Sequence, residues 1–155
     1  MSEELIRILK EAISIEEESY ELYLIAQEKA KLASSKSFLK ELAEMELEHK
    51  KKLARVISDR TQILTLGNQR GKSLEDLRIV DYMKDVASLS EDANYQEILA
   101  YAAQREKRTH DYYASLAKRF QGTRVGELFQ RLAEEELKHK IEIEKEYDNT
   151  FLKDN

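Results

Sequence analysis

Four long stretches of the sequence carry apolar or small side chains at the three- and four-residue spacing of an α-helix, which favours an all-α fold. These stretches are residues 3–32, 35–64, 93–120 and 123–147. The 155 residues include 4 Gly and no Pro, so the turns that a β-sandwich or barrel would need are scarce. The length suits a single domain, predicted to span residues 1–155.

The connections between the stretches predict how the helices are arranged. Short breaks separate the first stretch from the second and the third from the fourth, and helices joined so closely pack as antiparallel neighbours. A serine at 34 or 35 is the expected N-cap of the second helix, and Thr123 that of the fourth. Residues 65–92 are long enough to cross the bundle. We therefore predict an antiparallel four-helix bundle of two hairpins, 3–64 and 93–147, joined by a long crossover.

Charge and cysteine content exclude several functions. The net charge is −5 and no run of like charge exceeds three residues, which argues against nucleic acid as a partner. No apolar run approaches the ~18 residues of a membrane span, and residues 1–10 lack the apolar core of a secretory signal. We therefore expect no membrane partner and a cytoplasmic location. Because the sequence has no cysteine, it offers no disulfide framework, zinc finger or thiolate cluster.

Two of the three histidines belong to a pattern that occurs twice, at an offset of 90 residues. Each copy has a glutamate, a tyrosine seven residues later, and a Glu-x-x-His motif that begins thirty residues after the first glutamate. The copies are Glu16, Tyr23, Glu46 and His49, and then Glu106, Tyr113, Glu136 and His139. The two predicted hairpins are therefore internal repeats of each other.

The spacing of the glutamates predicts a metal site. The midpoint between the two glutamates of each hairpin falls beside the turn, so the two side chains lie level, and a Glu-x-x-His pair shares one helix face. All four glutamates interrupt apolar stripes, where an unpaired carboxylate costs several kcal/mol. Two divalent cations would balance the four negative charges. Carboxylate and imidazole ligands without sulfur favour iron or manganese over copper or a structural zinc.

These motifs resemble those of the ferritin-like di-iron carboxylate proteins, and specifically the rubrerythrin branch. Residues 12–23 and 38–49 carry the resemblance most strongly, and it extends over nearly the whole chain. It implies a ferritin-like bundle with two iron ions per chain, with manganese or a mixed pair as alternatives. By this resemblance Glu46 and Glu136 would bridge the ions, Glu16 with His49 and Glu106 with His139 would be terminal ligands, and Tyr23 and Tyr113 would hydrogen-bond ligand carboxylates.

The resemblance also implies an oxidoreductase that reduces hydrogen peroxide or dioxygen. Typical rubrerythrins add a rubredoxin-like domain with four cysteines, so here the electrons would come from a separate protein such as a rubredoxin. Thr109 stands where rubrerythrins carry a further glutamate, and His110 could replace it as a ligand or serve as an interhelix histidine. Glu135 and Met45 are equivalent in the repeat but differ chemically, and Glu135 could orient an imidazole or be solvated.

Two other functions remain open: a ferroxidase or iron-sequestration protein, and a non-catalytic metal-binding bundle. Cage-forming ferritins usually carry a short fifth helix, and only eight residues follow Tyr147, which disfavours a storage cage. A metal-free interaction module would leave the buried glutamates unexplained. We expect a homodimer, from the resemblance and from the apolar residues Ile63, Leu64 and Leu66.

Overall fold

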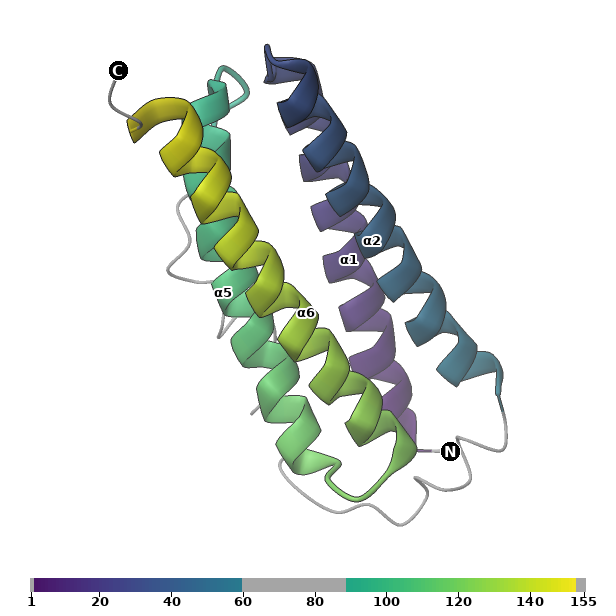
Figure 1. Cartoon of the computed structure of the whole chain (residues 1–155). Helices are drawn as coiled ribbons and strands as arrows, with labels where there is room; N and C mark the ends of the chain where they lie inside the picture. Colours follow the sequence, from purple (N-terminus) through teal and green to yellow (C-terminus); the bar gives the residue numbers. More distant parts are fainter. Residues whose placement is uncertain (1, 60–88, 153–155) are drawn as a thin grey trace.

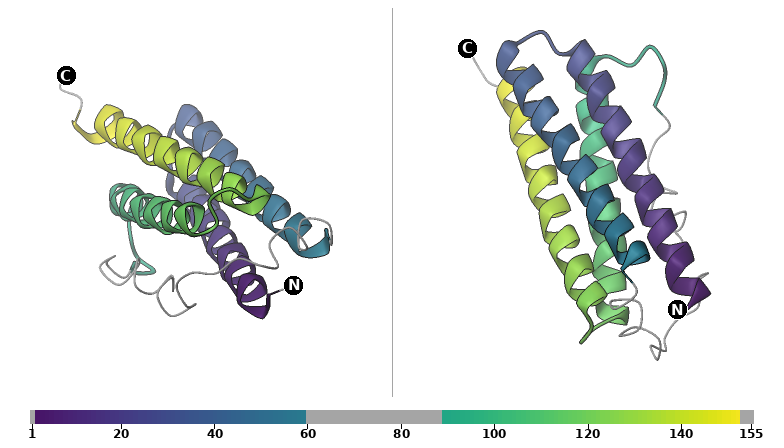
Figure 2. Two further views of the ribbon diagram at one scale, coloured as in Figure 1. Left: turned by 90° about the horizontal axis from the view of Figure 1, so that it is seen from below. Right: turned by 90° about the vertical axis from the view of Figure 1, so that its right-hand side faces the viewer.

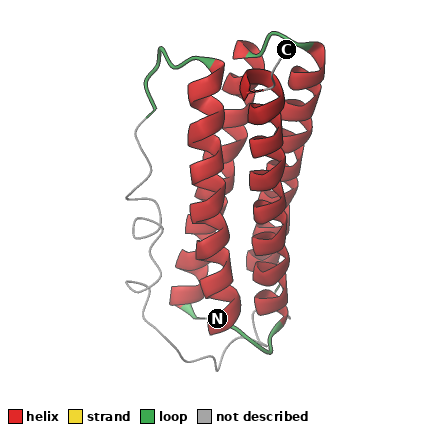
Figure 3. Ribbon diagram, turned by 60° about the vertical axis from the view of Figure 1, so that its left-hand side comes forward, coloured by secondary structure: helices red, strands yellow, loops and turns green. Residues whose placement is uncertain are grey.

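The computed structural model describes residues 2–59 and 89–152, and these residues form an all-α structure without strands (Figures 1 and 3). The long helices are α1 (Glu3–Lys29), α2 (Ala33–Ser58), α5 (Tyr95–Arg119) and α6 (Arg124–Tyr147). A π-helical turn, η2 (Asp148–Leu152), continues α6. The predicted fold class is confirmed. None of the helices in this part of the chain combines the length and apolar character that crossing a membrane requires.

The helices pack as two antiparallel hairpins, α1 with α2 and α5 with α6 (Figure 1). Helix α2 ends at the end of the bundle where α1 begins, whereas α5 begins at the opposite end (Figure 2). Helices α2 and α5 therefore run in the same direction, as a crossover between hairpins requires. Residues 60–88 lie outside the described residues, and with them most of the predicted crossover and the apolar residues 63, 64 and 66.

Side chains cap three of the helix starts, but the cap predicted for α2 was wrong. The Thr123 hydroxyl accepts a hydrogen bond from the Gly126 amide at 3.1 Å, as predicted for α6. Helix α2 instead begins at Ala33 without a side-chain cap, because the residue before it is leucine. Ser35 lies buried inside the helix, where its hydroxyl contacts Tyr95. Helix α2 also ends at Ser58, earlier than the predicted end near residue 64.

Two apolar clusters fill the bundle, one toward each end. The first contains residues from the start of α1, the end of α2, the end of α5 and the start of α6, including Leu9, Leu53 and Phe129. The second contains residues from the opposite halves of the same helices, including Leu42 and Leu99. Between the clusters each helix turns buried polar side chains toward its neighbours, so the core is interrupted at mid-height.

Gly126 sets the close approach between α6 and the turn that precedes it. A Cβ at this position would lie 2.1 Å from the Phe120 carbonyl oxygen. Because that atom belongs to the backbone, the turn would have to move, and we expect Gly126→Ala to lower the free energy of unfolding by about 1–3 kcal/mol in urea titrations. Gly122 (φ 88°) is the control, because its Cβ would meet nothing and Gly122→Ala adds only left-handed strain. A smaller loss at Gly126 than at Gly122 would contradict the packing argument.

Candidate metal centre

The polar layer at mid-height contains all six predicted metal ligands. Two residues of each helix replace apolar members of its buried stripe, and all are almost completely shielded from solvent. They are Glu16 and Ser19 on α1, Glu46 and His49 on α2, Glu106 and Thr109 on α5, and Glu136 and His139 on α6. The helical period and the antiparallel register thus carry residues from distant parts of the chain into one layer.

The ligand atoms form two overlapping groups. Glu16, Glu46, His49 and Glu136 each place one ligand atom within 4.8 Å of the others, and so do Glu46, Glu106, Glu136 and His139. Glu46 and Glu136 belong to both groups. Two ions held by these groups would have two carboxylates in common, and each would also have a glutamate and a histidine of its own.

Both imidazoles turn the same nitrogen toward the carboxylates. His49 Nδ1 lies 3.3 Å from Glu16 Oε1 and 3.2 Å from Glu46 Oε1. His139 Nδ1 lies 3.0 Å from Glu136 Oε1 and 3.3 Å from Glu46 Oε1. The two rings stack, with centroids 5.8 Å apart and planes 12° from parallel. Each Nδ1 is therefore the atom that could join the carboxylates in binding an ion.

Each tyrosine reaches across to the glutamate of the other hairpin. Tyr113 donates a hydrogen bond of 2.5 Å to Glu16 Oε2, and Tyr23 donates to Glu106 Oε1. Burial raises the pKa of both phenols well above its ordinary value, so both stay protonated donors. Each tyrosine therefore bonds to the glutamate of the other copy of the repeat, and these two hydrogen bonds join the hairpins.

Burial raises the pKa of three of the glutamates above its ordinary value. Desolvation and the neighbouring Glu46 carboxylate raise the pKa of Glu16 to about 7. Desolvation, with repulsion from nearby carboxylates, also raises the pKa of Glu106 and of Glu136 well above 4.5. These side chains stay ionised at neutral pH only if positive charge lies among them.

Glu46 and His49 carry the charge of the cluster as an ion pair. Desolvation acts to raise the pKa of Glu46, but the adjoining His139 and His49 imidazoles lower it to about 2. Desolvation acts to lower the pKa of His49, but contacts with Glu135, Glu16 and Glu46 raise it to about 12. One carboxylate is therefore compensated, whereas the raised pKa values of Glu16, Glu106 and Glu136 show that theirs are not.

The donor set fits a pair of divalent cations. The Oε2 atoms of Glu46, Glu106 and Glu136 are buried without a hydrogen-bond partner in the described part of the chain. Buried carboxylate oxygens are nearly always satisfied, and these lie where two ions would be shared. Four carboxylates and two neutral imidazoles would carry four negative charges against four positive ones. Such oxygen and nitrogen ligands suit iron or manganese.

Three further residues near the centre have clear positions. Glu135 Oε1 lies 3.0 Å from His49 Nε2, on the side of the ring that faces away from the carboxylates. His110 lies outside both groups, and its Nδ1 donates to the Ala133 carbonyl oxygen at 2.8 Å, so it joins α5 to α6. The Thr109 hydroxyl donates to the Arg105 carbonyl oxygen of its own helix.

Arg105 is a buried residue of this layer that the sequence reasoning missed. Its guanidinium donates to the Ser19 hydroxyl at 3.1 Å and to the Ile15 carbonyl oxygen at 2.9 Å, and it pairs with Glu18 at 3.2 Å. Its position in the buried stripe, three residues after Ala102 and four before Thr109, could have revealed it. It joins α5 to α1 beside Glu106.

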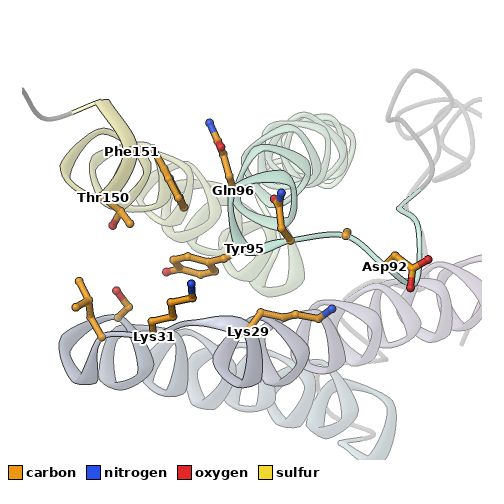
Figure 4. Close-up of a pocket in the computed structure, with 11 residues that line it drawn as sticks. Lys29, Lys31, Asp92, Tyr95, Gln96, Thr150 and Phe151 are labelled. Atoms are coloured by element: carbon orange, nitrogen blue, oxygen red, sulfur yellow. The ribbon is translucent and has the colours of Figure 1, made fainter.

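A recess of about 430 Å³ at one end of the bundle is separate from this centre (Figure 4). It lies between the α1–α2 turn, the start of α5 and η2, where Tyr95 and Phe151 make a tilted ring contact at 5.9 Å. None of the six predicted ligands lines it.

The fold and the centre together define a class: ferritin-like four-helix bundles with a di-iron type of carboxylate and histidine site. A family model described as rubrerythrin matches residues 7–94 and 97–155. The chain belongs to the rubrerythrin family. Comparisons with curated proteins and with solved structures gave no match.

Proposed function

We propose that this protein is a di-iron oxidoreductase that reduces hydrogen peroxide, or dioxygen, with electrons from an external donor. The observation that supports this most is the pair of overlapping ligand groups that share Glu46 and Glu136. Membership of the rubrerythrin family, whose members are ferritin-like di-iron proteins and usually oxidoreductases, supports the same reading. In this proposal Glu46 and Glu136 would be ligands common to two irons, while Glu16 with His49 would hold one iron and Glu106 with His139 the other.

Two ferrous ions held there would supply the two electrons that, with two protons, convert one hydrogen peroxide to two waters. The residues of the chain would prepare the centre for this. Tyr113 and Tyr23 hold one oxygen of Glu16 and of Glu106, which fixes the orientation of each terminal carboxylate. The apolar clusters above and below the polar layer limit the access of water along the bundle. These 155 residues contain no cysteine, so a rubredoxin-type protein is the proposed source of electrons.

Stopped-flow mixing of the di-ferrous protein with peroxide or dioxygen tests the proposal. We expect oxidation in a single turnover to be faster than that of free Fe(II) in the same buffer, and repeated turnover only when a reducing partner such as reduced rubredoxin is present. His49→Ala and His139→Ala are expected to slow oxidation, since each removes a nitrogen ligand, and Tyr23→Phe to slow it less.

The outcomes separate the candidate functions. Rapid oxidation by dioxygen with no gain from a reducing partner would favour a ferroxidase instead. Oxidation by neither reagent faster than free Fe(II) would exclude an enzyme and leave a metal-binding bundle. Because Thr109 occupies the place of the additional rubrerythrin glutamate, both oxidants need to be compared on the same preparation.

A further inference from the structure

The two halves of the metal centre are related by the repeat, but Glu135 breaks that relation. Its carboxylate contacts the outer nitrogen of His49, Nε2, at 3.0 Å. The residue ninety positions earlier is Met45, whose thioether cannot replace a carboxylate. Within the described ranges 2–59 and 89–152, the outer nitrogen of His139 is buried and has no hydrogen-bond partner. One ligand imidazole therefore has a carboxylate partner and the other has none.

This difference bears on how each imidazole binds a cation. A carboxylate on Nε2 holds the proton there, so that Nδ1 presents its lone pair to the ion, and it makes the ring a stronger donor. Nδ1 of His49 already points at Glu16 and Glu46. His139 also points Nδ1 at the shared carboxylates, but its ring is held by packing and by stacking on His49.

A second difference between the two halves of the centre also favours cation binding by Glu16 and His49. Arg105 is buried next to Glu106, and its positive charge acts on that carboxylate. The equivalent residue beside Glu16 is Ile15, which carries no charge. A fixed positive charge in a buried layer opposes the binding of a cation near it. Glu18 of α1 offsets part of this charge, so the effect of Arg105 on the half of the centre formed by Glu106 and His139 is small but unfavourable.

The two halves of the centre also differ in their access to solvent. A surface recess of about 310 Å³ is lined by His49 and Glu135, together with acidic side chains of α2 such as Glu44 and Glu48. Another surface recess, of about 490 Å³, reaches Glu16. Glu16 and His49, the residues that belong to this half of the centre alone, thus both border openings to solvent, and both openings are lined mainly by carboxylates, which attract cations.

We propose that Glu135 is a positioning residue that makes the half-site of Glu16 and His49 the first, and the tighter, of the two to take up a divalent cation. The inference rests on the proposed function, since it presupposes a centre for two ions. Loss of an outer partner of a ligand histidine typically lowers metal affinity about 10–100-fold. A centre with unequal halves would also accept mixed metal pairs, with the tighter-binding ion beside His49.

Zinc titration of the metal-free protein, labelled with ¹⁵N-histidine, tests the order of filling. The chain has three histidines, so single alanine variants assign every imidazole signal, and Zn²⁺ is a diamagnetic probe that needs no turnover. We expect the His49 signals to shift with the first equivalent, in the pattern of an Nε2–H imidazole bound through Nδ1. The His139 signals should shift with the second equivalent.

Glu135→Ala is expected to lower the affinity of the first step about 10–100-fold and so to weaken the preference for His49. Glu135→Gln, which keeps the shape and removes the charge, should fall between this variant and the wild type. The matched control is Glu134→Ala, on the same helix and with the same charge change, because Glu134 is exposed and contacts Gln130. It should keep both the order and the affinity.

The alternative outcomes test the order of filling, the role of Glu135 and the metal centre separately. Simultaneous shifts of His49 and His139 in the wild type, or His139 first, would overturn the inference while leaving the metal centre intact. A Glu135→Ala protein that binds zinc as Glu134→Ala does would overturn the role of Glu135. A protein that binds no zinc would overturn both this inference and the centre on which it rests.

Discussion

Alanine in place of Glu46 or of Glu136 is expected to remove both metal ions from the protein. Each of these glutamates belongs to both ligand groups. Glu46 Oε1 lies 3.2 Å from His49 Nδ1 and 3.3 Å from His139 Nδ1, so the carboxylate stands between the two imidazoles. Removing it would take one ligand from each ion and one of the negative charges that hold them both.

Elemental analysis after iron loading and gel filtration measures this effect. The wild-type protein should retain close to two ions per chain, and Glu46→Ala and Glu136→Ala close to none. Glu16→Ala serves as a comparison within the centre, since it takes a ligand from one group and should leave the other ion bound. Glu134→Ala, an exposed glutamate on the same helix as Glu136, should bind as the wild type does. One ion retained by Glu46→Ala would show that this carboxylate does not bridge.

The sequence predicted the bundle and the meeting of the six candidate ligands because the helical period and the 90-residue repeat led to the same arrangement. The helical period placed Glu16 and Glu46 in buried stripes, and the short α1–α2 break fixed the height at which they face each other. The offset of 90 residues then predicted the same geometry for α5 and α6. Since α1 contacts α5 and α2 contacts α6, the two level pairs form one layer.

Features that depend on contact between the hairpins could not be predicted from the spacing of residues along the sequence. Tyr23 lies in the same copy of the pattern as Glu16, yet its hydroxyl reaches Glu106 of the other copy. Arg105 would be costly in a core by itself, and only the Ser19 hydroxyl and the Ile15 carbonyl oxygen of α1 make its burial possible. These partners become visible only when the hairpins are docked.

The metal-free protein is expected to lose stability as the pH rises from about 5 to 8. Glu16 has a pKa of about 7 in the fold, above its ordinary 4.5, so between these values the folded chain holds a proton that the unfolded chain has released. Stability therefore falls with rising pH across this window, on the order of 3 kcal/mol from Glu16 alone. Glu106 and Glu136, whose pKa values are also raised, act in the same direction.

Glu46 and His49 do not reverse this trend. Glu46 has a lowered pKa of about 2, so its contribution is complete above about 4.5 and is lost only in stronger acid. His49 has a raised pKa of about 12, so its contribution is complete below its unfolded value and declines as the pH rises further. Neither group makes the protein more stable as the pH rises from 5 to 8.

Urea unfolding of chelator-treated protein at several pH values would measure this dependence. Glu16→Gln removes one titrating group and should flatten the slope, whereas Glu44→Gln, an exposed change on α2, should leave it as in the wild type. Bound metal should reverse the sign, because the ligands must lose their protons to bind an ion and binding therefore strengthens as the pH rises. A metal-free protein that becomes steadily more stable from pH 5 to 8 would contradict the raised pKa values. It would mean that the buried carboxylates are compensated by something other than protons or metal ions.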